Sequence, residues 1–127
     1  MIKLVNIKME YDKKVVLDNI NLTVAPGETV AIIGPSGSGK STLLRLMVGL
    51  TKPSAGEIWI ENEEISQYKE NDLNKVRLKM GMVFQYSALF DFLSVGENVA
   101  FGLRQHTKLS NKEIQAIVKE KLRVVGL

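Results

Sequence analysis

The sequence predicts an α/β fold that has an antiparallel β part near its N-terminus and a helical part near its C-terminus. Three observations support this class. Residues 2–24 alternate between apolar and polar side chains, as half-buried strands do. Residues 30–33, Val-Ala-Ile-Ile, are apolar on both faces, which is typical of a central strand in a covered parallel sheet. From residue 94 onward, the apolar residues recur at helical spacing.

The first elements are expected to form a hairpin. Strands at about 2–11 and 15–24 flank a turn at residues 12–14, and Pro26-Gly27 ends the second strand. The strand at 30–33 leads into a glycine-rich loop and then into a helix over 43–50. This helix is apolar on most of its circumference, so we expect it to be buried. Gly49 and Pro53 bring it to an end.

Shorter elements occupy the middle of the chain. Residues 56–66, GEIWIENEEIS, predict two short strands around a turn at Glu61-Asn62. Residues 71–80 predict a helix with Leu73, Val76 and Met80 on one side, and residues 81–84 predict another short apolar strand.

Two capped helices are predicted in the last third of the chain. Ser94 can cap a helix that runs to about Arg104. Ser110-x-x-Glu113 is a capping box that opens a second helix, and Gly126 closes that helix in a left-handed conformation. Its apolar positions at helical spacing are Ile114, Ile117, Val118 and Leu122.

Composition excludes several classes of function. The chain has 127 residues, about one domain, and its net charge of +3 comes from interspersed acids and bases, which argues against a nucleic-acid partner. It has no cysteine, which excludes disulfides and thiolate metal sites, and its one histidine, His106, is interpreted as a solvated loop residue. No apolar run reaches the ~18 residues of a membrane span, and residues 1–14 lack a signal-peptide core. We therefore expect a cytoplasmic protein.

Residues 34–41, GPSGSGKS, fit the phosphate-loop pattern G-x-x-x-x-G-K-[ST]. Glycines let successive backbone N–H groups turn toward phosphates, and the following helix points its positive end at them. Lys40 would reach the β- and γ-phosphates, Ser41 would ligate Mg²⁺, and Thr42 would support them. Kinases, GTPases, motors and transporters all share this loop. The predicted nucleotide-binding residues are Gly34, Pro35, Ser36, Gly37, Ser38, Gly39, Lys40, Ser41 and Thr42.

Four features together resemble the N-terminal half of an ATP-binding cassette (ABC) ATPase subunit, which has a P-loop NTPase fold. They are Tyr11, GPSGSGKSTLL at 34–44, PSAGEIWIENEEIS at 53–66 and MGMVFQYSALFDFLSVGENVAFGL at 80–103. The resemblance implies ATP and Mg²⁺ as cofactors. It also implies that residues 1–127 are the N-terminal part of one such domain, with 1–85 as its β-rich core and 86–127 as the start of its helical subdomain.

The resemblance assigns roles to further residues. Tyr11 matches the aromatic residue that stacks on adenine, although a tyrosine packed in a half-buried strand is also common. Gln85 matches the Q-loop residue whose amide oxygen reaches Mg²⁺ and the attacking water, so Lys40 and Gln85 are the predicted catalytic residues and Ser41 and Gln85 the metal ligands. The groove beside the Q-loop receives a helix of the transmembrane subunit. The apolar residues expected to line or support it are Tyr86, Leu89, Phe90 and Phe92.

Partners and substrate also follow from the resemblance. It implies a homodimer with a second ATPase subunit, a transmembrane permease, and a position on the inner face of the cell membrane. Residues 84–110 are most similar to ATPases of Mla-type phospholipid transport systems, which work with MCE-domain lipid-binding proteins. Importers of amino acids and other small solutes have similar segments, so that substrate class remains an alternative.

Parts that the family needs for hydrolysis are not found in these 127 residues. They are the signature segment, a Walker B strand that ends in Asp-Glu, and a switch histidine. The resemblance implies that the intact subunit hydrolyses ATP to power a transporter. We interpret this chain as an incomplete part of such an enzyme, which binds nucleotide without hydrolysing it by itself. A nucleotide-binding module without turnover is the alternative reading. A small-molecule P-loop kinase is a third reading, which the match over 80–103 opposes.

Overall fold

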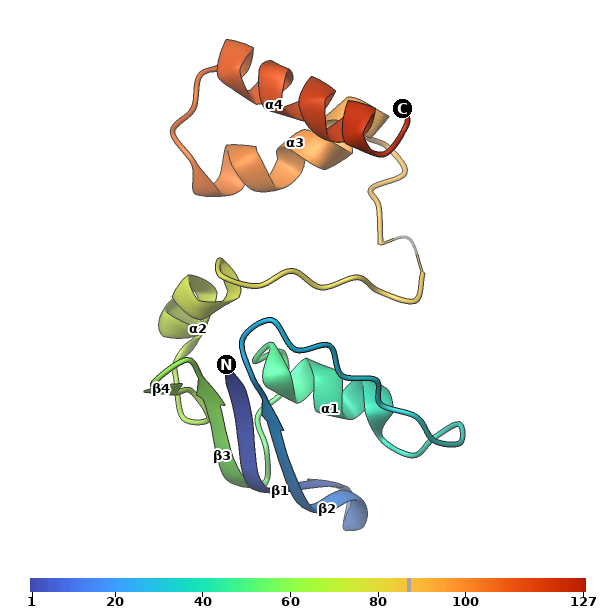
Figure 1. Cartoon of the computed structure of the whole chain (residues 1–127), viewed down its shortest axis with the longest axis vertical. Coiled ribbons are helices and arrows are strands. Elements are labelled where there is room, and N and C mark those ends of the chain that lie inside the picture. The colour runs from blue at the N-terminus through green and yellow to red at the C-terminus, as the bar shows by residue number, and fades with distance from the viewer. Residues whose placement is uncertain (87) are drawn as a thin grey trace. The chain divides into compact units, whose positions relative to one another are not determined.

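The computed structural model describes residues 1–86 and 88–127. The chain divides into two compact units, Met1–Val83 and Phe84–Leu127, and each is described by itself. Figure 1 shows the elements of both units with their labels.

The first unit contains an antiparallel sheet with the strand order β2-β1-β3-β4. Strands β1 (Ile2–Tyr11) and β2 (Lys14–Val24) form the predicted hairpin, and their turn residues Asp12 and Lys13 have φ angles of 47° and 68°. Strands β3 (Ala55–Ile60) and β4 (Glu63–Glu64) confirm the two predicted strands around residues 61–62. β1 lies between β2 and β3, so Leu4 pairs with a residue on each side of it.

Helices α1 (Lys40–Met47) and α2 (Glu70–Arg77) complete this unit. α1 lies against one face of the sheet (Figure 1), and its side chains join those of the strands in one core. The expectation that this helix is buried around most of its circumference is wrong, because Leu44 of α1 is 47% exposed and Leu50, in the turn after it, is 50% exposed. Only one side of this short helix packs on the sheet. The core residues of the helices are Leu43, Leu46, Met47, Leu73 and Val76.

Two predicted strands are not formed. Residues 29–35 and 80–84 have no regular secondary structure, and Ile33 and Val83 are 92% and 96% exposed. A strand is stabilised by ladder hydrogen bonds to a neighbour. Within the described residues, every paired strand belongs to the antiparallel sheet, and neither segment has a partner there. The predicted buried parallel strand at 30–33 is therefore wrong, and of its residues Ile32 packs against the core.

The second unit consists of helices α3 (Val95–His106) and α4 (Asn111–Val124) and the segment before them. Both predicted caps are confirmed: Ser94 Oγ accepts a hydrogen bond from the N–H of Glu97, and Ser110 and Glu113 form the capping box. Gly126 has the expected left-handed conformation, with a φ of 82°. His106 is exposed, as predicted, but it is the last residue of α3 and not a loop residue. The buried residues are Ala100, Ile114 and Val118.

None of the helices in the described part of the chain combines the length and the apolar character that crossing a lipid bilayer requires.

A candidate phosphate-binding site

The glycine-rich loop at residues 34–39 has a backbone conformation that its glycines make possible. Gly37 and Gly39 have φ angles of 79° and 92°, a region that residues with a Cβ atom rarely adopt. Gly39 also lies directly against β2, since a Cβ atom there would be 2.8 Å from Leu17 Cδ2 and 3.2 Å from the Val16 carbonyl oxygen. Gly39 is therefore required both for the turn and for seating the loop on the sheet.

The loop ends in the N-terminus of α1, where backbone N–H groups are available to an anion. Gly39 is the N-cap residue, and its carbonyl accepts the first helical hydrogen bond, from Leu43 N–H at 2.8 Å. Across the described residues, no side chain caps this end, and the first turn carries no acidic residue. The first N–H groups of a helix have no partner within it, and they form the positive end of its dipole. This end of α1 is therefore suited to bind phosphate.

Lys40 folds back across the loop. Its ammonium group donates hydrogen bonds to the carbonyl oxygens of Gly34 at 2.9 Å and Pro35 at 2.7 Å. An ammonium group has three donors, so these two bonds leave one for another acceptor. The side chain thus places a positive charge inside the loop, at the end of α1 that carries the free N–H groups.

Hydroxyl groups and solvent surround the rest of the loop. Ser36, Ser38 and Ser41 are exposed, and Thr42 is half-buried in the first turn of α1. In the described chain, no group of three or more His, Cys, Asp or Glu side chains could hold a metal by itself. Mg²⁺ prefers oxygen ligands and is commonly bound through substrate phosphates together with one or two protein oxygens. The Ser41 hydroxyl fits that pattern, and its assignment as a metal ligand stays a prediction.

Tyr11 lies at the end of the hairpin that supports the loop. It is the last residue of β1 and is 45% exposed. Leu17, which touches the Gly39 position, pairs with Met9, two residues before Tyr11. The hairpin therefore brings the end of β1 to the side of the sheet on which the loop is seated. Stacking of Tyr11 on adenine stays a prediction.

Gln85, the other predicted catalytic residue, belongs to the second unit and is exposed. The apolar residues that follow it are also exposed: Tyr86 by 81%, Leu89 by 67% and Phe92 by 79%. The role of Gln85 at Mg²⁺ and the role of these residues in a partner groove stay predictions.

Asn98 organises that apolar segment, and our reading of the sequence did not identify it. Its side-chain amide accepts a hydrogen bond from Phe90 N–H at 2.8 Å and donates to the Phe90 and Leu93 carbonyls at 3.0 and 3.1 Å. The Phe90 ring packs on Phe101, with ring centroids 4.7 Å apart. An asparagine within a helix is intrinsically unfavourable, and that was the available signal for such a side-chain-to-backbone contact.

Comparison with known families gives a match over most of the chain. The sequence model described as "ABC transporter" matches residues 17–126. The whole chain is 43% identical to the intermembrane phospholipid transport system ATP-binding protein MlaF of Haemophilus influenzae, and it covers 48% of that protein. Over 112 residues it is 46% identical to MlaF of Escherichia coli K12, covering 88% of this chain and 42% of that one.

An iron importer is nearly as similar. The chain is 41% identical over 128 aligned residues to the Fe(3+) ions import ATP-binding protein FbpC of Escherichia coli K12, which covers 99% of this chain and 34% of that protein. The chain thus spans about half or less of the length of these curated relatives.

Solved structures show the same fold. All of the chain superposes, with a TM-score of 0.92 and 36% identity, on 58% of the ATP-binding cassette MJ0796, described as a dimer in a post-hydrolysis state bound to ADP and Pi. A second dimeric structure of the MJ0796 cassette gives a TM-score of 0.91 at 37% identity, again over 58% of that chain. The predicted P-loop NTPase fold of the ABC ATPase type is confirmed.

Proposed function

The chain belongs to the ABC transporter ATP-binding family, and from this premise we propose that its loop at 34–42 binds Mg-ATP, which the intact subunit hydrolyses to drive transport. The observation that carries the proposal is the combination of two left-handed glycines, Lys40 inside the loop, and an uncapped N-terminus of α1. Together they place several N–H donors and one positive charge at a single point, as a triphosphate requires.

Binding of the triphosphate follows from the groups that the loop already holds. Phosphate oxygens accept hydrogen bonds from the loop and from the first turn of α1, and the charge of Lys40 compensates theirs. Lys40 then exchanges its bonds to the Gly34 and Pro35 carbonyls for bonds to phosphate. The Ser41 hydroxyl, supported by Thr42, would hold Mg²⁺, and in the intact subunit Gln85 would orient the attacking water. When bound, Mg²⁺ neutralises charge that develops on the β- and γ-phosphates.

The proposed cargo is phospholipid. Two relatives at 43% and 46% identity are named as phospholipid transport ATP-binding proteins, which supports this assignment. FbpC, an iron importer at 41% identity, supports the alternative of an importer for a small solute. The two are separated by measuring ATPase activity of the subunit with its permease in liposomes. Stimulation that depends on the phospholipid headgroup supports the first, and stimulation by a solute with its binding protein supports the second.

The proposed assembly is a homodimer of ATPase subunits bound to a permease at the inner face of the membrane. In the phospholipid systems an MCE-domain protein would join them. The solved MJ0796 structures are described as dimers, which supports the first part of this proposal.

The 127-residue chain by itself is proposed to bind Mg-ATP without hydrolysing it. Phosphoryl transfer needs groups that orient water and stabilise the developing charge, besides a loop that binds the phosphates. Release of inorganic phosphate above the buffer background, abolished in Lys40→Ala, would overturn this part of the proposal.

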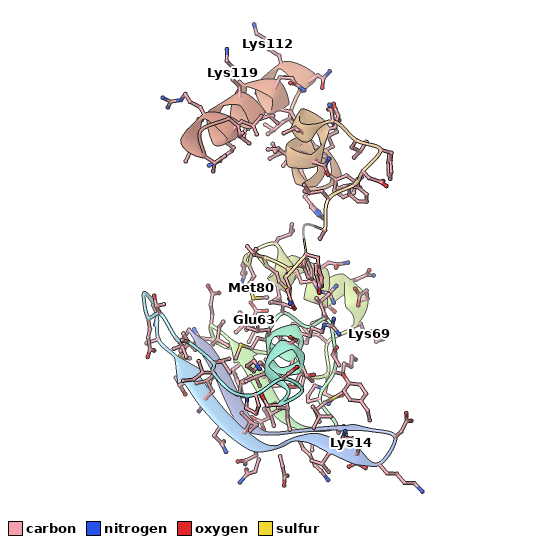
Figure 2. All side chains as sticks on the ribbon, turned by 90° about the vertical axis from the view of Figure 1, so that its right-hand side faces the viewer. Lys14, Glu63, Lys69, Met80, Lys112 and Lys119 are labelled. Atoms are coloured by element: carbon pink, nitrogen blue, oxygen red, sulfur yellow. The ribbon has the colours of Figure 1, made fainter. Side chains whose placement is uncertain are left out.

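Calorimetry tests nucleotide binding. Wild-type chain is titrated with Mg-ATP beside Lys40→Ala, which removes the charge inside the loop, and we expect affinity to fall at least tenfold. Lys119→Ala is the matched control, because Lys119 projects from the side of α4 that faces away from α3 (Figure 2) and is exposed. Equal binding by wild type and Lys40→Ala would overturn the proposed site.

A further inference from the structure

The C-terminal end of α1 is closed by two sets of hydrogen bonds. The first set lies in the turn that ends the helix: Leu50 N–H donates to the Arg45 carbonyl at 2.9 Å, and Gly49 N–H donates to the Leu46 carbonyl at 3.0 Å. With Gly49 at a φ of 68°, this is a Schellman ending. The carbonyls of Val48 and Gly49 point out of this arrangement and require partners elsewhere.

Arg77, at the end of α2, supplies those partners. Its Nε donates to the Val48 carbonyl at 3.3 Å, and its Nη2 donates to the Gly49 carbonyl at 2.7 Å. The side chain is 24% exposed, so most of it is withdrawn from water. A cation at this position also compensates the negative end of the α1 dipole.

The remaining nitrogen of Arg77 is held by α2. Nη1 donates to Asn74 Oδ1 at 2.9 Å and to the carboxylate of Glu70. Glu70, Asn74 and Arg77 are spaced four and three residues apart, which places them on one side of α2. The hydrogen bond from Arg77, together with its positive charge, lowers the pKa of Glu70. The planar group therefore joins both helices in a fixed geometry.

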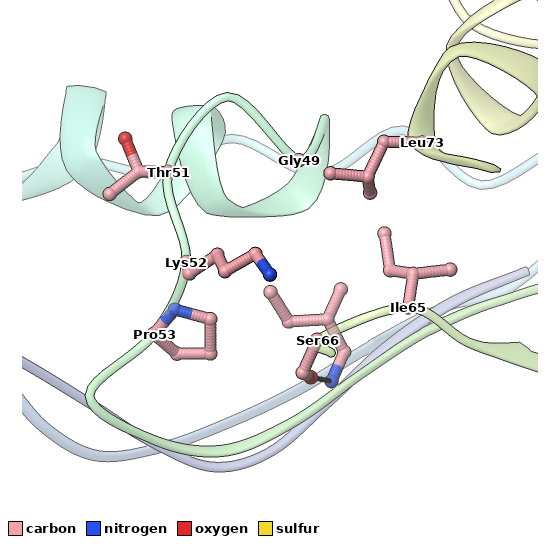
Figure 3. A pocket seen from close by; sticks show the side chains of 8 residues that line it. Gly49, Thr51, Lys52, Pro53, Ile65, Ser66 and Leu73 are labelled. Carbon is pink, nitrogen blue, oxygen red and sulfur yellow. Dashed lines mark hydrogen bonds between the residues drawn. The ribbon is translucent and has the colours of Figure 1, made fainter. Parts of the chain in front are cut away.

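Close packing supports the same junction. Leu73 of α2 lies against Gly49, where an added Cβ atom would be 2.8 Å from Leu73 Cδ2. Figure 3 shows Leu73 beside Gly49, and both of them and Ile65 line a cavity of about 10 Å³. Such a volume holds about one water molecule. Leu73 thus contacts the C-terminal end of α1 directly, beside the hydrogen bonds of Arg77.

We propose that Arg77 is a positioning residue of the nucleotide site, which holds α1 from the end opposite to the phosphates. The helix is eight residues, or about 12 Å, long. A rod of two turns that tilts at one end also moves at the other, where its N–H groups and Lys40 meet the triphosphate. Arg77 itself does not touch the nucleotide. This inference rests on the proposed function, because it takes the loop at 34–42 as the ATP site.

The experiment measures the Kd of Mg-ATP for Arg77→Met, which keeps the apolar stem and loses every donor, and for Arg77→Lys. We expect the Kd to rise at least threefold in Arg77→Met. It should rise by less in Arg77→Lys, which keeps the positive charge but loses the planar guanidinium group that reaches both helices. Lys75→Met is the matched control. Lys75 lies on α2 as well and pairs with Asp72 at 2.9 Å, without a hydrogen bond to α1 in the described chain. Its Kd should equal that of wild type.

Stability is measured in parallel, by urea unfolding followed through the fluorescence of Trp59, the single tryptophan. A purely structural residue would lower the free energy of unfolding and leave the Kd of the folded protein unchanged, and this result overturns the inference. If Arg77→Met does not fold, the comparison of Arg77→Lys with wild type decides in the same way. A wild-type chain that binds no Mg-ATP would instead overturn the proposed function on which the inference rests.

Discussion

The two units are stabilised by different means. In the first, Met1–Val83, the described residues include a core of twelve buried apolar side chains, from the sheet, both helices and Ile65 between β4 and α2. In the second, Phe84–Leu127, the described core consists of Ala100, Ile114 and Val118. Burial of apolar area is the dominant favourable term in folding, so the first unit has much more of it.

Local polar contacts replace part of this burial in the second unit. Ser94 and Ser110 cap its two helices, and Asn98 fixes the segment that precedes α3. At the same time, the unit exposes large apolar side chains such as Tyr86 and Phe92. The comparison teaches that the glycine-rich loop is attached to the unit with the large apolar core. The other unit has few buried residues, and its exposed apolar segment is held by polar contacts instead. The following predictions test that difference, from the largest expected effect to the smallest.

Truncation of the larger core should have the largest effect. Leu46 of α1 is fully buried, and Leu46→Ala removes its side chain from between the helix and the sheet. We expect a loss of about 2–5 kcal/mol in the free energy of unfolding. Urea unfolding followed by Trp59 fluorescence measures it. A loss smaller than that caused by any change in the second unit would contradict the contrast between the two cores.

Removal of the Asn98 amide should have the next largest effect, confined to the second unit. Asn98→Leu keeps the volume and removes the hydrogen bonds to Phe90 N–H and to the Phe90 and Leu93 carbonyls, each worth about 0.5–1.5 kcal/mol. Hydrogen exchange at the Phe90 amide should become faster. Thr107→Val is the control, since it removes the bond from Thr107 Oγ1 to the Leu103 carbonyl at the other end of α3. Equal exchange at Phe90 in Asn98→Leu and wild type would refute the role given to Asn98.

Loss of the α4 cap should cost less. Ser110→Ala removes the acceptor for Glu113 N–H, and we expect a destabilisation of about 1 kcal/mol. Ser110→Asn, which keeps a capping side chain, should stay close to wild type. The measurement is helix content by circular dichroism during thermal unfolding. If Ser110→Ala and Ser110→Asn unfold at the same temperature, the Ser110 cap does not contribute to the stability of α4.

The smallest effect should be a pH dependence of the same cap. Hydrogen bonds from the Ser110 hydroxyl and N–H lower the pKa of Glu113 below its ordinary value of 4.5. A carboxylate whose pKa is lower in the folded state adds stability above its unfolded pKa and loses it as the pH falls through the folded one. Helix content should therefore decline in acid below about pH 4.5, and less steeply in Ser110→Ala. Parallel pH profiles of the two proteins would contradict this.

Local signals in the sequence were sufficient for much of this structure. The hairpin, both helix caps, the left-handed Gly126 and the glycine loop were predicted because each depends on residues a few positions apart. The strands at 30–33 and 81–84 were predicted wrongly because a strand also needs a partner strand. A run of apolar residues indicates that a segment tends to be buried. It does not indicate which strand, if any, pairs with that segment.

The sequence by itself determined the family and located the glycine-rich loop with Lys40, because both are recognised from residues at fixed spacing along the chain. Only the tertiary structure decided how that loop is supported. Gly39 is seated on Val16 and Leu17 of β2, and Arg77 binds carbonyls 28 and 29 residues before it. Contacts between residues so far apart leave no periodic trace in the sequence, because they depend on where the folded elements meet.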